Sequence, residues 1–139
     1  MLKKYLVVVD ESKELENAIY FAASRAQKLN RSISLLYVID HAINAQWSKI
    51  ENLIEQEATS DAKKICRKWA QNIKDRFGIE CEIILKLGDR VDEILKLLRE
   101  DKTIRFLILA SASESEDPGP IIRALIGKKN KELSIPIVI

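Results

Sequence analysis

The sequence predicts an α/β domain in which a parallel sheet carries helices on both faces. Five strand-like runs alternate along the chain with four helix-like stretches, an order typical of doubly wound domains. The first run, Leu6–Val9, is entirely aliphatic and shows no alternation of polar and apolar residues. Such a run indicates a strand buried on both faces, as in the middle of a parallel sheet. We therefore expect one domain over residues 1–139, organised around this strand.

Composition supports a single globular domain and argues against several classes of function. The chain has 139 residues, 47% of them hydrophobic and 32% charged, which is enough for one core of ordinary size. Its 23 basic and 21 acidic residues nearly cancel, so we expect neither a nucleic-acid nor a membrane binder. No apolar run approaches the roughly 20 residues that cross a bilayer, and nothing reads as a signal peptide, so we expect a cytoplasmic protein. Cys66 and Cys81 lie on separate predicted elements without a CxxC spacing, which predicts neither a metal site nor a disulfide.

The residues after the first strand predict a helix and a second parallel strand. Ser12 is a suitable N-cap, and apolar residues then recur at three-and-four spacing as far as Leu29. The second strand, Ile33–Ile39, is again almost continuously apolar and is followed by His41, the single histidine. Two strands joined by a helix of this length predict a right-handed parallel βαβ unit.

The middle of the chain predicts a long helix, a strand nearer the edge and a third helix. Residues 42–77 contain no proline or glycine and predict a helix from about 46 to 77, with a break near 59–61 left open. Gly78 suits a left-handed cap. The strand Ile79–Leu87 alternates at first, which favours an edge position. Asp89 then serves as the N-cap of the third helix.

The last third of the chain predicts a central strand, a loop, a helix and a closing strand. The strand Phe106–Ala110 is fully apolar and is followed by a loop over residues 111–119. Pro120 suits the first position of the last helix, because the N–H that it lacks is not needed there. The closing strand, Ile135–Ile139, contains a proline, which favours an edge.

Four segments together resemble the universal stress protein family, in the same order and over the whole chain. They are the run from Tyr5 to Ser12, the strand Leu35–Val38, the turn Leu87-Gly88-Asp89 and the closing segment Ser134–Ile139. The resemblance implies an adenine nucleotide alpha hydrolase-like fold, with five parallel strands in the order 3-2-1-4-5 and helices on both faces. It also implies a homodimer formed through the last strand, with Ile135, Ile137, Val138 and Ile139 in the contact.

The ATP-binding members of that family carry a Gly-x2-Gly-x9-Gly-Ser/Thr motif after the fourth strand, and this chain departs from it. Ala110 and Ser113 stand where the first two glycines belong, and Gly127 matches the third but is followed by Lys128. Each lost glycine adds a Cβ that would crowd the phosphates, and the acidic stretch 114–117 would repel them. We therefore expect that this chain does not bind ATP in the usual way.

The resemblance still implies a candidate adenine-nucleotide crevice, which would take ATP or AMP. Its members are Asp10, Val38, Ala110, Ser111, Ser113, Gly127 and Lys128. The resemblance places Asp10 on the adenine side and Val38 in the lining of the base pocket. From the residues alone, Asp10 is as well suited to cap the adjoining helix or loop as to meet a ligand.

Three other features have two interpretations each. His41 would face the crevice, but a lone histidine without a nucleophile partner is typical of a loop. The serines and acidic residues of 111–119 suit a phosphate, a metal or a phosphorylation site, and equally a solvated loop. Lys128 and its neighbours would neutralise a phosphate or form the cationic end of the last helix.

We expect a binding or regulatory role in stress adaptation, without catalysis; this role is what the resemblance implies. The alternative is an adenine-nucleotide binder with a remodelled phosphate loop, which uses Asp10, Val38, Gly127 and Lys128 and includes slow ATP hydrolysis. A receiver-like or flavodoxin-like domain fits less well. The receiver needs a phosphoacceptor aspartate at the end of the third strand and a lysine after the fifth, and the third strand here ends in Leu87-Gly88-Asp89.

Overall fold

The computed structural model describes residues 3–10, 12–39, 48–110 and 137–138, with residues 48–55 and 137–138 described by their backbone only. The strands are β1 (Lys4–Val8), β2 (Ser32–Ile39), β3 (Cys81–Leu87), β4 (Ile104–Ile108) and β5 (Ile137–Val138). The helices are α1 (Leu15–Leu29), α2 (Ser48–Phe77) and α3 (Arg90–Glu100). The strands lie in the order β3-β2-β1-β4-β5, and each pairing is parallel.

β1 lies in the middle of the sheet because both of its faces are apolar. Side chains alternate between the faces of a strand. Val7 belongs to the core beneath α1 and α2, and Leu6 and Val8 belong to the core beneath α3. Leu6 and Val7 are both 0% exposed. The central position predicted for this aliphatic run is therefore confirmed.

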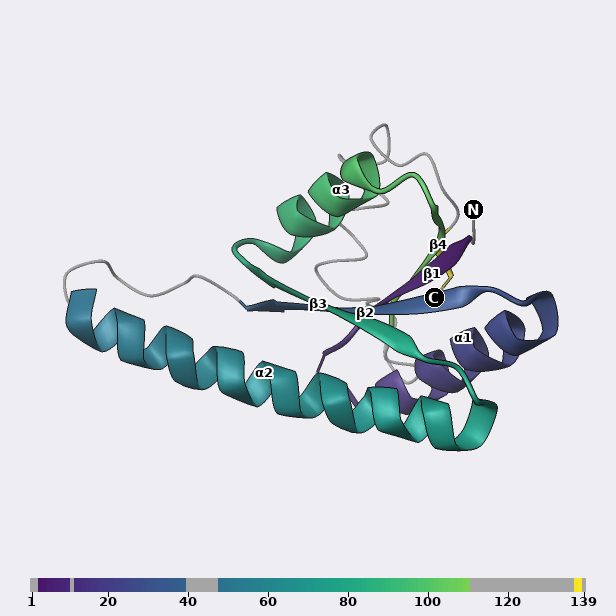
Figure 1. Ribbon diagram of the computed structural model, residues 1–139. Helices are drawn as coiled ribbons and strands as arrows, with labels where there is room; N and C mark the ends of the chain where they lie inside the picture. Colours follow the sequence, from purple (N-terminus) through teal and green to yellow (C-terminus); the bar gives the residue numbers. More distant parts are fainter. Residues whose placement is uncertain (1–2, 11, 40–47, 111–136, 139) are drawn as a thin grey trace.

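The helices cover opposite faces of the sheet, as the doubly wound prediction requires. α1 and α2 pack on one face and α3 on the other (Figure 1). The chain moves outward from β1 to β2 to β3, and then returns past β1 to β4. Because connections between parallel strands are right-handed, this reversal moves the next helix to the opposite face.

Two of the predicted helix boundaries are confirmed by their caps. The carboxylate of Asp89 accepts a hydrogen bond from the backbone N–H of Asp92 at 3.0 Å, so Asp89 is the N-cap of α3. Gly78 follows α2 with φ of 68°, and its N–H donates to the carbonyl of Lys74 at 2.9 Å. A left-handed residue at a helix end is the geometry that glycine favours.

The predicted N-cap of α1 is wrong. α1 begins at Leu15, and Glu14 occupies the cap position without a side-chain capping bond. Ser12 lies too early to cap the helix, and its N–H and hydroxyl both donate to the carboxylate of Asp10 instead. The local bond of a strand-end aspartate to the residue two positions on has competed successfully with helix capping.

The start of β4 differs from the prediction because the pairing with β1 decides it. β4 begins at Ile104, two residues before the predicted start, since Ile104 is buried and pairs with Lys4 of β1. The exposed Arg105 interrupts the apolar run in the sequence, so the pattern alone does not show that the strand starts at Ile104.

The long second helix, α2, continues without a break through residues 59–61. The predicted last helix, from Pro120, lies outside the described residues.

None of the described helices combines sufficient length with a sufficiently apolar, uncharged stretch to cross a bilayer.

Lys4 forms ion pairs that link β1 to β3 and to the end of α3, on the side of the sheet where the strands begin. The ammonium of Lys4 lies 2.8 Å from a carboxylate oxygen of Asp101, just after α3, and 3.6 Å from Glu82 of β3. The hydrogen bond to Asp101 raises the pKa of Lys4, against the opposite effect of burial. Burial raises the pKa of Asp101, but the hydrogen bonds from Lys4 and Thr103 outweigh it and leave the pKa below its ordinary value.

Replacing Lys4 with Met should lower the free energy of unfolding by about 1 kcal/mol at pH 7, because a partly buried charge pair is lost while the apolar stem remains. The stabilisation by Asp101 is present above the unfolded pKa of an aspartate. It disappears as the pH falls through the lowered folded pKa, so the two proteins should converge in acid. Urea unfolding between pH 7 and pH 2 measures this. Lys63→Met, at an exposed position of α2, is the control, and an equal loss in that variant would contradict the assignment.

Candidate functional site

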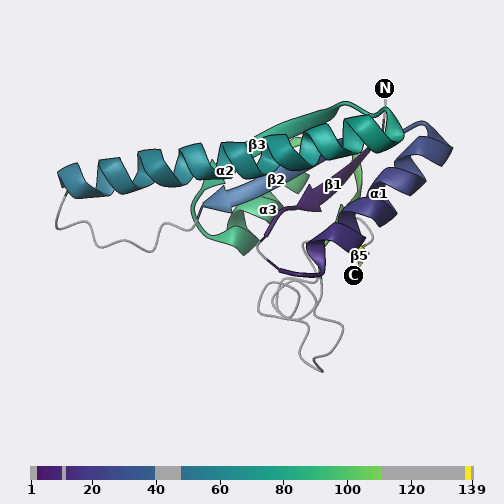
Figure 2. The same ribbon diagram turned by 90° about the horizontal axis from the view of Figure 1, so that it is seen from below.

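The carboxyl ends of β1, β2 and β4 lie on the same side of the sheet, because the strands are parallel. Figure 2 shows those of β1 and β2. Open parallel sheets bind ligands at this edge, near the point where the strand order reverses. Asp10 follows β1, Val38 lies near the end of β2, and Ala110 follows β4. These three residues are the part of the predicted crevice that the structure describes.

Asp10 holds the turn that leaves β1. One oxygen of its carboxylate accepts hydrogen bonds from the N–H of Ser12 at 2.9 Å and from the hydroxyl of Ser12 at 2.6 Å. This arrangement is an Asx turn, in which a short acidic side chain imitates a backbone turn. The structural interpretation of Asp10 is therefore supported by its contacts, and its part in a nucleotide crevice stays a prediction.

Val38 and Ala110 lie toward different faces of the sheet. Val38 is 2% exposed and belongs to the core beneath α3. Ala110 is half-buried and packs against the core beneath α1 and α2. The remaining predicted residues, Ser111, Ser113, Gly127 and Lys128, lie outside the described residues, as do His41 and the loop 111–119. The phosphate half of the predicted crevice therefore stays a prediction.

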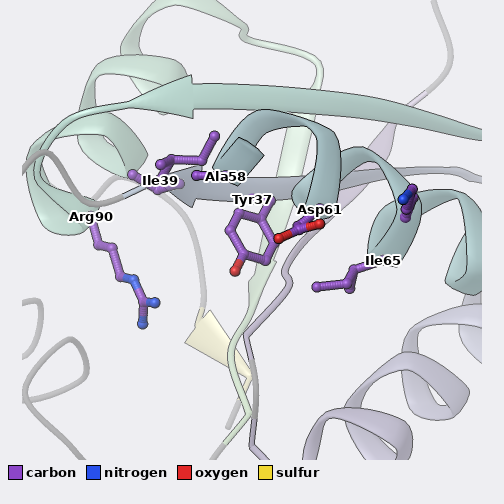
Figure 3. A pocket seen from close by; sticks show the side chains of 8 residues that line it. Tyr37, Ile39, Ala58, Asp61, Ile65 and Arg90 are labelled. Atoms are coloured by element: carbon purple, nitrogen blue, oxygen red, sulfur yellow. The ribbon is translucent and has the colours of Figure 1, made fainter. Parts of the chain in front are cut away.

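A pocket of about 580 Å³ opens at the carboxyl end of β2, against the middle of α2 and the start of α3 (Figure 3). Pockets for small molecules usually measure roughly 300–1,000 Å³, so this one has a suitable size. Its lining residues are Tyr37, Val38, Ile39, Ala58, Asp61, Lys64, Ile65 and Arg90. Val38 is the one predicted site residue among them, and Figure 3 shows Tyr37 between Arg90 on one side and Asp61 and Ile65 on the other.

Three charged side chains line this pocket and were not singled out from the sequence. Asp61 and Lys64 are exposed on α2, and Arg90 is half-buried at the first residue of α3. In the described part of the chain, none of these three side chains forms a hydrogen bond or ion pair. In the sequence, Asp61 and Lys64 resemble any solvated helix face and Arg90 any residue after an N-cap, so no local pattern could have identified them.

Neither cysteine has the properties of a reactive thiol. Cys66 is buried and Cys81 half-buried, and both are free. Burial raises the pKa of each thiol to about 11, so almost none of it is thiolate at neutral pH. Within the described ranges, no group of three His, Cys, Asp or Glu side chains is placed to hold a metal ion.

Comparison with known proteins identifies relatives of the whole chain. The model of the universal stress protein family matches residues 1–127. A universal stress protein of Helicobacter pylori is 30% identical over 136 residues, which cover 94% of this chain and 94% of that protein.

Solved structures agree on the fold. The universal stress protein UspA from Lactobacillus plantarum has a TM-score of 0.82 at 16% identity, over 98% of this chain and 95% of that one. A universal stress protein from Archaeoglobus fulgidus in complex with dAMP has a TM-score of 0.70 at 16% identity, over 99% and 96%. A family protein from Arabidopsis thaliana with AMP bound has a TM-score of 0.67 at 20% identity, over 98% and 89%.

The Asx turn of Asp10 should contribute measurably to stability. Ser12→Ala removes one of its two hydrogen bonds, and we expect a loss of about 0.5–1 kcal/mol in the free energy of unfolding because the pair is exposed. In the Asp10→Ala, Ser12→Ala double variant, the loss should be smaller than the sum of the single losses. Chemical denaturation measures this cycle, with Ser60→Ala as an exposed serine control. Fully additive losses would show that the two side chains act independently.

The two thiols should be slow to react in the folded protein. At pH 8 a thiol with a pKa of about 11 is roughly one-thousandth thiolate, so labelling by a thiol-reactive dye should be slow compared with a free cysteine. In denaturant, both thiols should react at the rate of an ordinary cysteine. Mass spectrometry of timed samples gives the labelled fraction, and rapid labelling of the native protein would contradict the buried placement.

Proposed function

Because this chain belongs to the universal stress protein family, we propose that it is a regulatory domain of stress adaptation that acts by binding and performs no chemistry of its own. The observation that carries the proposal is the pocket at the end of β2. Its described lining combines apolar walls with three charged side chains and includes no serine, threonine, cysteine or histidine. Groups of this kind hold and orient a ligand, whereas nucleophilic catalysis requires an activated hydroxyl or thiol next to a base.

We also propose that the domain does not hold ATP in the usual way of its family. Ala110 has a Cβ where the motif has its first glycine, and it packs against the core beneath α1 and α2. A backbone that carries a side chain at this point cannot approach a phosphate as closely as glycine does. Lys128 in place of the motif's Ser or Thr supports the same proposal.

The second candidate function is adenine-nucleotide binding with a remodelled phosphate loop. It is favoured by Val38, which lines the pocket at the end of β2 and which the family resemblance places in the lining of a base pocket. The relatives crystallised with dAMP and AMP support a nucleotide as the ligand. In this candidate function, Asp10 and Val38 contact the adenine base, and Gly127 and Lys128 contact the phosphates. The domain would also hydrolyse ATP slowly.

Calorimetry with ATP, ADP and AMP distinguishes the two candidates. If the loop after β4 does not bind phosphates as it does in the ATP-binding family members, ATP should bind no more tightly than AMP, because the β- and γ-phosphates gain no contacts. Titrations reach millimolar nucleotide, and thermal shifts provide an independent measurement. ATP binding at least about tenfold tighter than AMP would contradict the first proposal. Nucleotide binding that Lys128→Ala leaves unchanged would exclude the remodelled loop.

The chain is further proposed to form a homodimer through its last strand. β5 is at one end of the strand order, and it pairs with Leu107 and Ile108 of β4 on its inner side. An edge strand presents backbone N–H and C=O groups that a second strand can bind. Pairing of two copies of this strand would extend the sheet across both domains.

Sedimentation velocity at tens of micromolar protein tests the dimer. We expect a single species of twice the monomer mass that persists when the salt concentration is raised, since backbone pairing depends little on screening. A monomer under these conditions would contradict the proposal.

A further inference from the structure

We propose that the groove between α1 and β4 is a docking surface for an acidic segment of a partner protein. The segment places one large apolar side chain in the groove and its carboxylates against Arg25 and Arg31. Among the described residues, this groove shares no lining residue with the pocket at the end of β2. The inference therefore goes beyond the proposed function, because it concerns a different surface and a protein partner.

The size of the groove suits a single side chain. Its volume is about 170 Å³. The described lining consists of Tyr5 from β1, Phe106 and Ile108 from β4, and Phe21, Arg25 and Leu29 from α1. A cavity of about 150 Å³ is large enough for a benzene ring, whereas most small-molecule pockets measure roughly 300–1,000 Å³. The groove therefore fits one aromatic or branched aliphatic side chain of a partner better than a whole small molecule.

The helix α1 exposes apolar side chains beside this groove. Phe21 is 40% exposed and Leu29 is 51% exposed. Their spacing places them with Arg25 on one face of the helix, because residues four apart are neighbours on a helix surface. The residues that α1 buries, among them Ile19 and Ala23, belong to the core. Exposed apolar side chains that gather around a pocket are typical of a contact with another protein.

Two arginines give the groove a positive charge. The guanidinium carbon of Arg25 lies 5.4 Å from the centre of the Phe21 ring. The guanidinium carbon of Arg31 lies 5.9 Å from the centre of the Tyr5 ring and 6.0 Å from that of Phe106. These cation–π contacts hold both charges next to the apolar lining. None of the described lining residues is acidic, so an incoming carboxylate meets attraction without a competing anion.

Arg31 also has hydrogen-bond donors without an acceptor. Its Nε and Nη1 atoms are buried and have no hydrogen-bond partner in the described part of the chain. Buried donors are costly to leave unpaired, and a carboxylate can accept from two guanidinium N–H groups at once. Because the residue as a whole is only half-buried, a change of rotamer would bring these donors to a partner. An acidic segment would thus supply the counter-ion of Arg31.

The charge of this surface argues for an acidic partner and against a second copy of the chain. Lys28 follows Arg25 in the same part of α1, and both are exposed. A symmetric contact between two copies brings the same surface of each copy together. Two cationic surfaces would then face each other and repel. Aspartate or glutamate beside the anchoring side chain removes this repulsion.

The test measures binding of three short, fluorescein-labelled synthetic peptides to the full chain by fluorescence anisotropy. The first has a phenylalanine flanked by aspartate and glutamate. The second has the same phenylalanine flanked by asparagine and glutamine, and the third has the acidic flanks around an alanine. The first peptide should bind at least about tenfold more tightly than either of the others, because it alone combines the anchor with the charge-assisted contacts.

Matched variants of the chain locate the binding site. Arg25→Gln and Arg31→Gln should each weaken binding of the first peptide by about fivefold or more, whereas Arg67→Gln, at an exposed position of α2, should change it by less than about twofold. Leu29→Ser should weaken binding likewise, and Leu87→Ser, at a leucine that is 41% exposed outside the groove, is its control. Thermal unfolding shows whether each variant is folded. The exposed positions of Arg25 and Leu29 keep the test decisive if Arg31→Gln does not fold.

The outcomes separate this inference from the proposed function. The inference is overturned if the first peptide does not bind, if the second binds as tightly, or if Arg67→Gln weakens binding as much as Arg25→Gln. It is also overturned if Leu29→Ser converts a dimer to a monomer in sedimentation, because a second copy would then cover the groove. None of these results changes the ratio of ATP to AMP affinity, which tests the proposed function.

Discussion

The structure depends on the burial of β1 on both faces. A strand with Leu6 and Val8 on one side and Val7 on the other cannot be covered by one layer of helices. The hydrophobic effect therefore requires helices above and below the sheet, and right-handed crossovers supply them only if the chain reverses direction once. That reversal, between β3 and β4, brings α3 to the second face. It also creates the crevice at the carboxyl edge, where ligands of open parallel sheets bind.

The two edges of the sheet use charge in different ways. At the edge where β1 begins, Lys4 and Asp101 neutralise each other at 2.8 Å and join the start of β1 to the end of α3. At the carboxyl edge, Lys64 and Arg90 line an open pocket without an ion-pair partner among the described residues. The Lys4–Asp101 pair therefore has a structural role. The apolar walls and charged groups of the pocket at the carboxyl edge are the features on which the proposed binding role rests.

Asp10 shows how a predicted site residue can also serve the fold. Its carboxylate closes the turn between β1 and α1 by accepting two hydrogen bonds from Ser12, and α1 begins only at Leu15. An acidic residue is useful there whether or not a nucleotide binds, because the turn needs an acceptor. The presence of Asp10 is thus weak evidence for a nucleotide, and the charged lining of the pocket beside Val38 is more informative.

The sequence by itself determined the fold class, the central position of β1 and the caps at Gly78 and Asp89. These features depend on local periodicity and on short-range hydrogen bonds, which neighbouring residues specify. It also identified the family, because that resemblance extends along the whole chain. Only the tertiary structure decided the start of β4, since the register with β1 recruits Ile104 across the charged Arg105. In the same way, Lys64 and Arg90 lie on separate helices and look like ordinary surface residues, and only the packing of α2 and α3 around the end of β2 brings them to one pocket.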